Sequence, residues 1–391
     1  MSWYGAIDFD RKDEQPVASN SSASFLRHFQ ELQDPRVERT RKHPLINIVF
    51  IAVCGVLSGA NSIAGIHEFA LDRRRWLARY LDLASGVPSE DTLGRVLARL
   101  DPGAFEKCLL SWTQAVQEVT THRFVAIDGK TLRGSSDHER GRAAIHMVSA
   151  WATANKLSLG QVVVGEKTNE ITAIPELLQL LDIAGALVTI DAMGCQRAIA
   201  DQIRAREADY VLAVKENQPT LHEQVQEAIA EALEQDAEEI EEHQTEERGH
   251  GRQECRTYAL FAKPNSVDPE GQWRDLSAVG MAISERVDGQ GRRSMETRYY
   301  ILSRRITVQE FAEAVRGHWS IENNLHWQLD VSFREDECRV SRDHAPANLS
   351  VIRRFVLGLL KRETSCRKGI EIKRVKCAGN DEYREKVLFK C

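Results

Sequence analysis

The stretch FVAIDGKTLRGS, from Phe124 to Ser135, runs from four apolar residues directly into an acid, Asp128. A short apolar run that ends at turn residues is typical of a buried strand. The stretch from Leu187 to Asp191 has the same organisation, because it too ends in an aspartate and has a glycine shortly after it. Ligands of α/β sheets gather at the carboxyl ends of the strands. If these strands are parallel neighbours, we expect Asp128 and Asp191 to meet at one edge of a sheet.

Two neighbouring carboxylates repel each other, and each raises the pKa of the other unless a cation lies between them. Mg²⁺ is the ion that binds one or two carboxylates and completes its octahedron with water and phosphate oxygens. We therefore expect a metal site here, with Lys130 and Arg133 placed to meet the phosphate groups on which the metal acts. For Asp128 the alternative is an ordinary Ile-Asp-Gly turn that ends a strand, in which the aspartate bonds its own backbone.

Glu322 is the candidate for a third acid. It lies in a predicted helix among the aromatic and apolar residues of 319–327, where a carboxylate has to be paired or to coordinate an ion. An ordinary helix ion pair is the alternative. A zinc site is a further alternative, because His318, Glu322 and His326 are spaced four residues apart on one helix face. The H-E-x-x-H signature of helical zinc hydrolases is absent.

The formal net charge of the 391 residues is −6, but the charge is unevenly distributed. Residues 216–247 hold twelve acids and no Lys or Arg, which leaves the rest at about +6. Residues 353–391 hold twelve Lys or Arg against five acids, and such a basic body predicts a polyanionic partner. The longest uncharged stretch, 44–67, is interrupted by Gly, Ser and Asn, so we expect a buried helix and no membrane contact. Without a C-x-x-C pair or a secretory signal, reduced cysteines and a cytoplasmic location are expected.

The periodicity predicts helices before residue 120 and a mixed α/β layer after it. Ser89 is expected to cap a helix that reaches Leu100. Residues 219–247 are expected to form one acidic helix. The expected strands are 124–132, 145–153, 157–166, 187–191, 210–215, 255–261, 276–286 and 296–302, and the expected later helices are 172–181, 196–207, 307–329 and 345–361.

Several segments resemble one bacterial family. They are AIDGKTLRGS (126–135), EITAIPELLQLLD (170–182), TIDAMGCQ (189–196), YVLAVKENQ (210–218), HWSIENNLHWQLDVSFRED (318–336), LQDPRVERTRKHPL (32–45) and VPSEDTLGRVLARLDP (87–102). They are similar to the H-repeat-associated, Rhs-linked proteins of the ISAs-type family of insertion-sequence transposases. The likeness covers about residues 25 to 390.

The resemblance implies an RNase H-like α/β fold with a mixed sheet. It implies a flexible leader (1–20), a helical transposase-associated domain that is a candidate for DNA binding (21–120), a catalytic core (121–218 and 306–362), an acidic and strand-rich insertion ahead of the glutamate helix (219–305), and a basic C-terminal tail (363–391). The tail is expected to touch DNA phosphates.

The resemblance also implies a DDE triad of Asp128, Asp191 and Glu322, which would bind two Mg²⁺ ions, with Mn²⁺ as the alternative ion. The broader group surrounds its glutamate with a Tyr-Arg-Glu-Lys pattern, but the corresponding positions here are Val315, His318 and Leu329. The phosphate-binding residues are therefore open, and the candidates are Lys130, Arg133, Lys215, Arg316, His318 and Asn323.

The implied activity is cleavage of double-stranded DNA at the ends of an insertion sequence, followed by strand transfer into target DNA. A homodimer or a larger synaptic complex on DNA is the expected assembly. Two alternatives stay open. In the first alternative, the chain is a catalytically inactive or non-mobile DNA-binding relative of such a transposase. In the second, it is an RNase H-like nuclease that cleaves DNA but does not join it.

Overall fold

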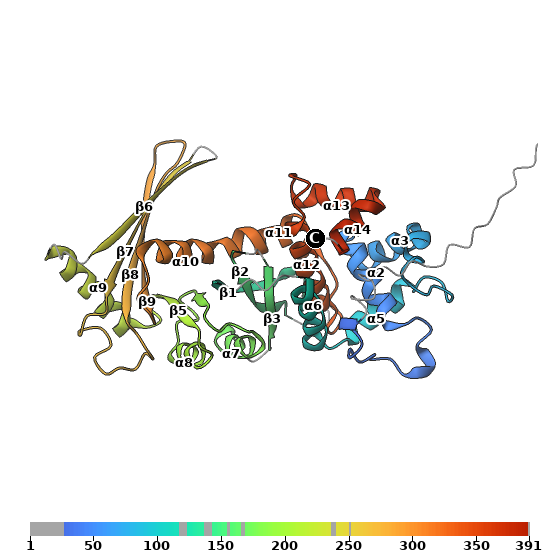
Figure 1. Ribbon diagram of the computed structural model, residues 1–391, viewed down its shortest axis with the longest axis horizontal. Helices are drawn as coiled ribbons and strands as arrows, with labels where there is room; N and C mark the ends of the chain where they lie inside the picture. Colours follow the sequence, from blue (N-terminus) through green and yellow to red (C-terminus); the bar gives the residue numbers. More distant parts are fainter. Residues whose placement is uncertain are drawn as a thin grey trace, which may run out of the picture.

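A computed structural model describes residues 27–116, 123–136, 143–154, 157–165, 169–235, 240–249 and 252–389. The expected leader, 1–20, lies outside these residues. The described strands form one nine-stranded mixed sheet in the order β3-β2-β1-β4-β5-β9-β8-β7-β6. Figure 1 shows the last four of these strands at one end of an elongated molecule and a group of helices at the other. The predicted mixed α/β class is confirmed.

The first five strands form the half of the sheet that carries the two aspartates. They are β1 (Phe124–Leu132), β2 (Ile145–Ala152), β3 (Leu157–Val164), β4 (Leu187–Ile190) and β5 (Asp209–Val214). Strand β4 lies between β1 and β5 and is parallel to both. Ile127 pairs with Ile190, so the next residues along the two strands are Asp128 and Asp191. The expected parallel neighbours are confirmed.

Alternate residues of these strands face opposite sides of the sheet, and each side has its own helices. Val125, Val188 and Leu212 pack with α7 (Glu170–Leu180), α8 (Arg197–Ala205) and α9 (Pro219–Glu234). Phe124, Leu187 and Val211 pack instead with α10 (Val308–Ile321). The helix that leads to Glu322 therefore packs on the opposite face of the sheet from α7, α8 and α9. It contacts the strand residues that alternate with those packed against these three helices.

The insertion continues the same sheet. It contains β6 (Glu241–Gly249), β7 (Arg252–Ala262), β8 (Ala278–Val287) and β9 (Arg293–Leu302), and β9 pairs with β5. Helix α9 ends at Glu234, and the prediction of one acidic helix over 219–247 is wrong for 241–247, which belong to a strand, while 236–239 lie outside the described residues. Residues 241–249 form β6 because they pair along their whole length with β7. A neighbouring strand outweighs local helix preference in this case, since strand formation depends strongly on context.

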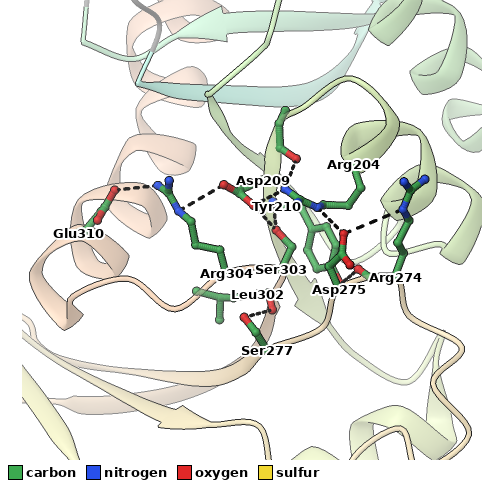
Figure 2. A network of polar contacts seen from close by, with 11 residues as sticks. Arg204, Asp209, Tyr210, Arg274, Asp275, Ser277, Leu302, Ser303, Arg304 and Glu310 are labelled. Atoms are coloured by element: carbon green, nitrogen blue, oxygen red, sulfur yellow. Dashed lines mark hydrogen bonds and ion pairs between the residues drawn. The ribbon is translucent and has the colours of Figure 1, made fainter.

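A buried aspartate fastens the end of the insertion to the core (Figure 2). Asp209, at the start of β5, accepts a hydrogen bond of 2.9 Å from the hydroxyl of Ser303, which follows β9. Its carboxylate also pairs with Arg204 of α8 and, at 3.2 Å, with Arg304. Arg304 reaches Glu310 in the first turn of α10 at 3.3 Å. These contacts fix where α10 starts and therefore the direction in which it crosses the sheet.

The helical end of the molecule is built from both ends of the chain. Its core contains α2 (Leu45–Leu57), of which eleven residues are buried, and α12 (Ala345–Arg362). The other helices there are α3 (Ile63–Asp72), α4 (Arg74–Leu77), α5 (Glu90–Arg99), α6 (Pro102–Val116), α11 (Trp327–Val331), α13 (Ile370–Gly379) and α14 (Asp381–Phe389). Among the described residues, short 3₁₀ turns lie at Glu38–Thr40, Arg133–Ser135 and Glu335–Glu337. Ser89 caps α5 as predicted, because its hydroxyl accepts the Thr92 N–H. Across the described residues, each helix is too short or too polar to cross a bilayer.

Residues 363–389 are largely helical, and their helices α13 and α14 pack against the helical core. Arg374 of α13 and Arg384 of α14 are 3% and 0% exposed. Both guanidinium groups donate to backbone carbonyls, Arg374 to Val56 and Arg384 to Cys377. These two arginines therefore use their charges inside the fold, and contact between the rest of the tail and DNA stays a prediction.

Candidate active site

Asp128, Asp191 and Glu322 line one cavity of about 220 Å³. Asp128 lies within β1, one residue beyond its pairing with β4, and Asp191 directly follows β4. Glu322 enters from the other side, at the end of α10. Residues separated by nearly 200 positions in the sequence are thus brought to one place by the parallel pairing of two strands and by a helix that crosses above them.

The loop after Asp191 is held by the residues that follow β5. The backbone N–H of Gly194 donates to Asp191 Oδ1 at 3.3 Å. The side-chain amide of Asn217 donates to the carbonyl of Ala192 at 2.5 Å, and that of Gln218 donates to the carbonyl of Cys195 at 2.9 Å. The Lys-Glu-Asn-Gln segment after β5 therefore fixes the backbone that carries the second acid.

Glu322 begins a π-helical turn, Glu322–His326, between α10 and α11. Such turns are rare and are frequent at functional sites, because the extra residue redirects the side chains of the helix. Ile321 and Leu325 on either side of Glu322 are buried, while Glu322 itself is exposed. No sequence signal indicated this turn, since its residues have ordinary helix preferences.

Burial and nearby negative charges raise the pKa of Asp128. Burial is the main cause, and the negative charges of Asp191, Glu170 and Glu322 add to it, so that the pKa reaches about 7 despite a hydrogen bond from the N–H of Gly129. His326 Nδ1 lies 3.5 Å from Asp128 Oδ2. Burial lowers the pKa of His326 to about 3, so this imidazole is neutral at pH 7 and does not neutralise the acids.

The donor set fits a hard divalent cation, because three carboxylates face one cavity and repel each other in the absence of positive charge. In the described part of the chain, no three His, Cys, Asp or Glu side chains lie close enough together to hold an ion without moving. The same finding applies to His318, Glu322 and His326, the residues of the zinc alternative. His318 Nδ1 lies 3.2 Å from the Thr189 hydroxyl, whereas His326 contacts Asp128, so the two imidazoles face different strands.

The residues predicted to bind DNA are placed differently from one another. Lys215 and His318 line the cavity. Arg133 is exposed, and its Nε lies 3.8 Å from Asp336. Asn323 is exposed beside Glu322. Arg316 is ion-paired with Glu247 of β6.

Lys130 is 8% exposed, and its ammonium group is paired with Asp330 of α11. Its charge is therefore used to connect β1 to the helix that follows Glu322.

The cavity residues Arg298 and Tyr300 were not predicted from the sequence, whereas Trp319 was expected close to Glu322. Arg298 and Tyr300 come from β9 of the insertion, and Trp319 comes from α10. The guanidinium of Arg298 lies 3.9 Å from the centre of the Trp319 ring. The only signal available in the sequence was their spacing of two, which places Arg298 and Tyr300 on one face of a strand.

Comparisons with known proteins match both regions of the chain. Residues 120–357 match the transposase DDE domain, and residues 26–113 match a DDE_Tnp_1-associated domain. The chain is 41% identical over 374 residues to "Putative transposase YncI" of Escherichia coli O157:H7, which covers 95% of this chain and 96% of that protein. It is 36% identical over 368 residues to "H repeat-associated putative transposase YhhI" of Escherichia coli K12, with 93% and 97% covered.

A shorter relative is "Inactive transposase YbfQ" of Escherichia coli K12, which is 30% identical over 75 residues, 19% of this chain and 89% of that protein. The DDE match spans more than half of the chain and includes β1, β4 and the helix of Glu322. The RNase H-like core expected from the resemblance is thereby confirmed. The chain belongs to the family of DDE transposases, together with the H repeat-associated proteins.

Proposed function

We propose that this chain catalyses metal-dependent cleavage of DNA at the ends of an insertion sequence and strand transfer of the freed ends into target DNA. The observation that carries the proposal is the meeting of Asp128, Asp191 and Glu322 in one cavity. The membership of the DDE transposase family supports DNA as the substrate. A homodimer or a larger complex on DNA is the assembly we propose, because two element ends have to be cut and joined together.

In this proposal the three carboxylates hold two Mg²⁺ ions, or Mn²⁺ in their place, which supply activation of the attacking oxygen and stabilisation of the leaving oxygen. The remaining task of the protein is to position the DNA strand and to offset its charge. Lys215 in the cavity wall is suited to the second role. His318, neutral because burial lowers its pKa, is suited to donate or accept one hydrogen bond.

Both chemical steps exchange one phosphorus–oxygen bond for another. In the first step a water oxygen bonds to phosphorus, the bond to the 3′-oxygen breaks, and that oxygen takes a proton. In the second step the freed 3′-hydroxyl loses its proton and bonds to a target phosphorus, whose own 3′-oxygen leaves. One set of acids therefore serves both steps.

The test uses the purified full chain, a supercoiled plasmid that carries the DNA flanking the gene, and Mg²⁺ or Mn²⁺. We expect Asp128→Asn, Asp191→Asn and Glu322→Gln each to lower the nicking rate by at least about 10³-fold. Glu170→Gln is the matched control, because Glu170 is an acid close to Asp128 that bonds His146 and does not line the cavity. Its nicking rate should stay within about tenfold of wild type.

Nicking by the triple variant at the wild-type rate would overturn the assignment of the acids. Strand transfer is tested separately with duplexes whose 3′ ends are already free. A chain that nicks but never joins these ends is a nuclease, and one that does neither while still binding the flanking DNA is a non-catalytic relative.

A further inference from the structure

The cavity of the acids also has a basic wall. Arg298 from β9 and Lys215 after β5 line it together with the three carboxylates. A phosphodiester is an anion, so three carboxylates repel it until positive charge is present on both sides of it. A cation held by the acids neutralises one side only. The basic wall is in the right place to neutralise the other.

Arg298 is held in a fixed position. Its Nε donates to Oε1 of Glu296 at 2.8 Å, its Nη2 lies 2.7 Å from the same oxygen, and its guanidinium lies over the ring of Trp319 at 3.9 Å. A guanidinium carries five N–H donors, so donors remain beyond the contact with Glu296. The side chain is 22% exposed and can therefore be reached from solvent.

We propose that Arg298, stacked on Trp319, forms with Lys215 a subsite for one phosphodiester group of the DNA strand that lies at the acids. A planar guanidinium with unused donors is suited to two phosphate oxygens at once, and Lys215 adds a point charge. The inference rests on the proposed function, because it specifies what the same cavity holds. It makes the insertion part of the active site, since Arg298 belongs to the insertion.

The first test is binding of the full chain to a duplex of the gene's flanking DNA, measured by fluorescence anisotropy in Ca²⁺ at several salt concentrations. Arg298→Gln is expected to weaken binding about tenfold and to lower the salt dependence by about one phosphate contact. Arg286→Gln is the matched control. Arg286 also bonds a glutamate, Glu254, and lies on the neighbouring strand β8, but it does not line the cavity. This control is expected to bind like wild type.

The second test distinguishes a phosphate contact from a loss of structure. Single phosphates of the duplex are replaced in turn by neutral methylphosphonates. Wild type should lose affinity at one position next to the cut site, and Arg298→Gln should be insensitive at that position. Thermal unfolding midpoints of both arginine variants should match wild type.

Equal binding and equal sensitivity of Arg298→Gln and wild type would overturn the subsite. That outcome does not depend on catalysis, because Ca²⁺ replaces the catalytic ion in both tests. Absence of nicking by the wild-type chain in Mg²⁺ would instead count against the proposed function, so the two failures are distinguishable.

Discussion

Asp128 and Asp191 are followed by glycines at places where an added side chain would meet its neighbours. A Cβ atom at Gly129 would lie 2.1 Å from Glu170 Oε1 and 2.7 Å from His146 Nε2. A Cβ atom at Gly194 would lie 2.3 Å from Cγ2 of Ile190, the residue that ends β4. The contact with Ile190 accounts for the glycine after Asp191, whereas at Gly129 the ends of the Glu170 and His146 side chains would have to shift. The glycines were visible in the sequence, but these contacts were not.

Glu363 gives a residue-scale prediction about pH. Burial raises its pKa, but hydrogen bonds from Ser365, Tyr383 and Cys366 outweigh that effect and lower the pKa to about 2. A pKa that is lower in the folded state than in the unfolded chain stabilises the protein above the unfolded value of about 4.5, and this stabilisation is lost as pH falls towards 2. We expect Glu363→Gln to lower the free energy of unfolding by about 3 kcal/mol at pH 7.

The measurement is urea unfolding of wild type and Glu363→Gln between pH 7 and pH 3. The difference between them should shrink steadily below pH 4.5. Glu371→Gln, at an exposed position of α13, is the control and should differ from wild type by less than about 0.5 kcal/mol. A difference that is constant from pH 7 to pH 3 would contradict the assigned role of the Glu363 charge.

An aromatic cluster on the sheet is among the contacts that position the helix leading to Glu322. Phe311 of α10 packs edge-on against Tyr258 and Tyr300, and a Cβ atom at Gly280 of β8 would lie 2.6 Å from its ring. Gly280→Ala is therefore expected to push α10 off the sheet and to cost about 1–3 kcal/mol. Nicking should fall as well, because Glu322 moves with the helix.

A double-mutant cycle tests this element. Phe311→Leu removes the ring atoms that the new methyl group would meet. The double variant should therefore be more stable than the sum of the two single losses predicts, by at least about 1 kcal/mol in urea unfolding. Strict additivity would show that the contact between Gly280 and Phe311 does not position the helix.

The elements differ in how far the sequence predicted them. Strand β1, which contains Asp128, and strand β4, which Asp191 follows, were predicted within one residue of their bounds, because an apolar run that meets an acid and a glycine is a local signal. Strand β6 was predicted as a helix, since its strand form depends on β7. The π-helical turn at Glu322 and the placing of Arg298 in the cavity had no local signal, because both follow from packing between distant segments.

At the scale of the whole molecule, the segment that carries Glu322 runs into the helical end of the molecule. Arg374 connects this segment to the first helices of the chain. Its guanidinium donates to the carbonyls of Val56 and Ala60 near the end of α2 and to that of Ser332 after α11. It is 3% exposed and lies 4.3 Å from the centre of the Phe333 ring. The C-terminal segment thus connects the first helices of the chain to the segment that carries Glu322.

We expect Arg374→Met to cost about 3 kcal/mol, because it removes a buried guanidinium that donates to the carbonyls of Ala60 and Ser332 as well as to that of Val56. Arg367→Met, at an exposed position of the same segment, is the control and should change stability by less than about 0.5 kcal/mol. Chemical unfolding followed by tryptophan fluorescence measures both. Equal small effects would mean that the C-terminal segment is not part of the core.

The central claim concerns the whole fold, because the three acids belong to different elements of it and meet only in the assembled chain. The most direct measurement is anomalous diffraction from crystals of the full chain grown with Mn²⁺. The account predicts manganese peaks within about 2.5 Å of carboxylate oxygens of Asp128, Asp191 and Glu322, with the side chains drawn together around the ions. Manganese bound elsewhere at saturating concentration, with these three carboxylates still apart and uncoordinated, would contradict it.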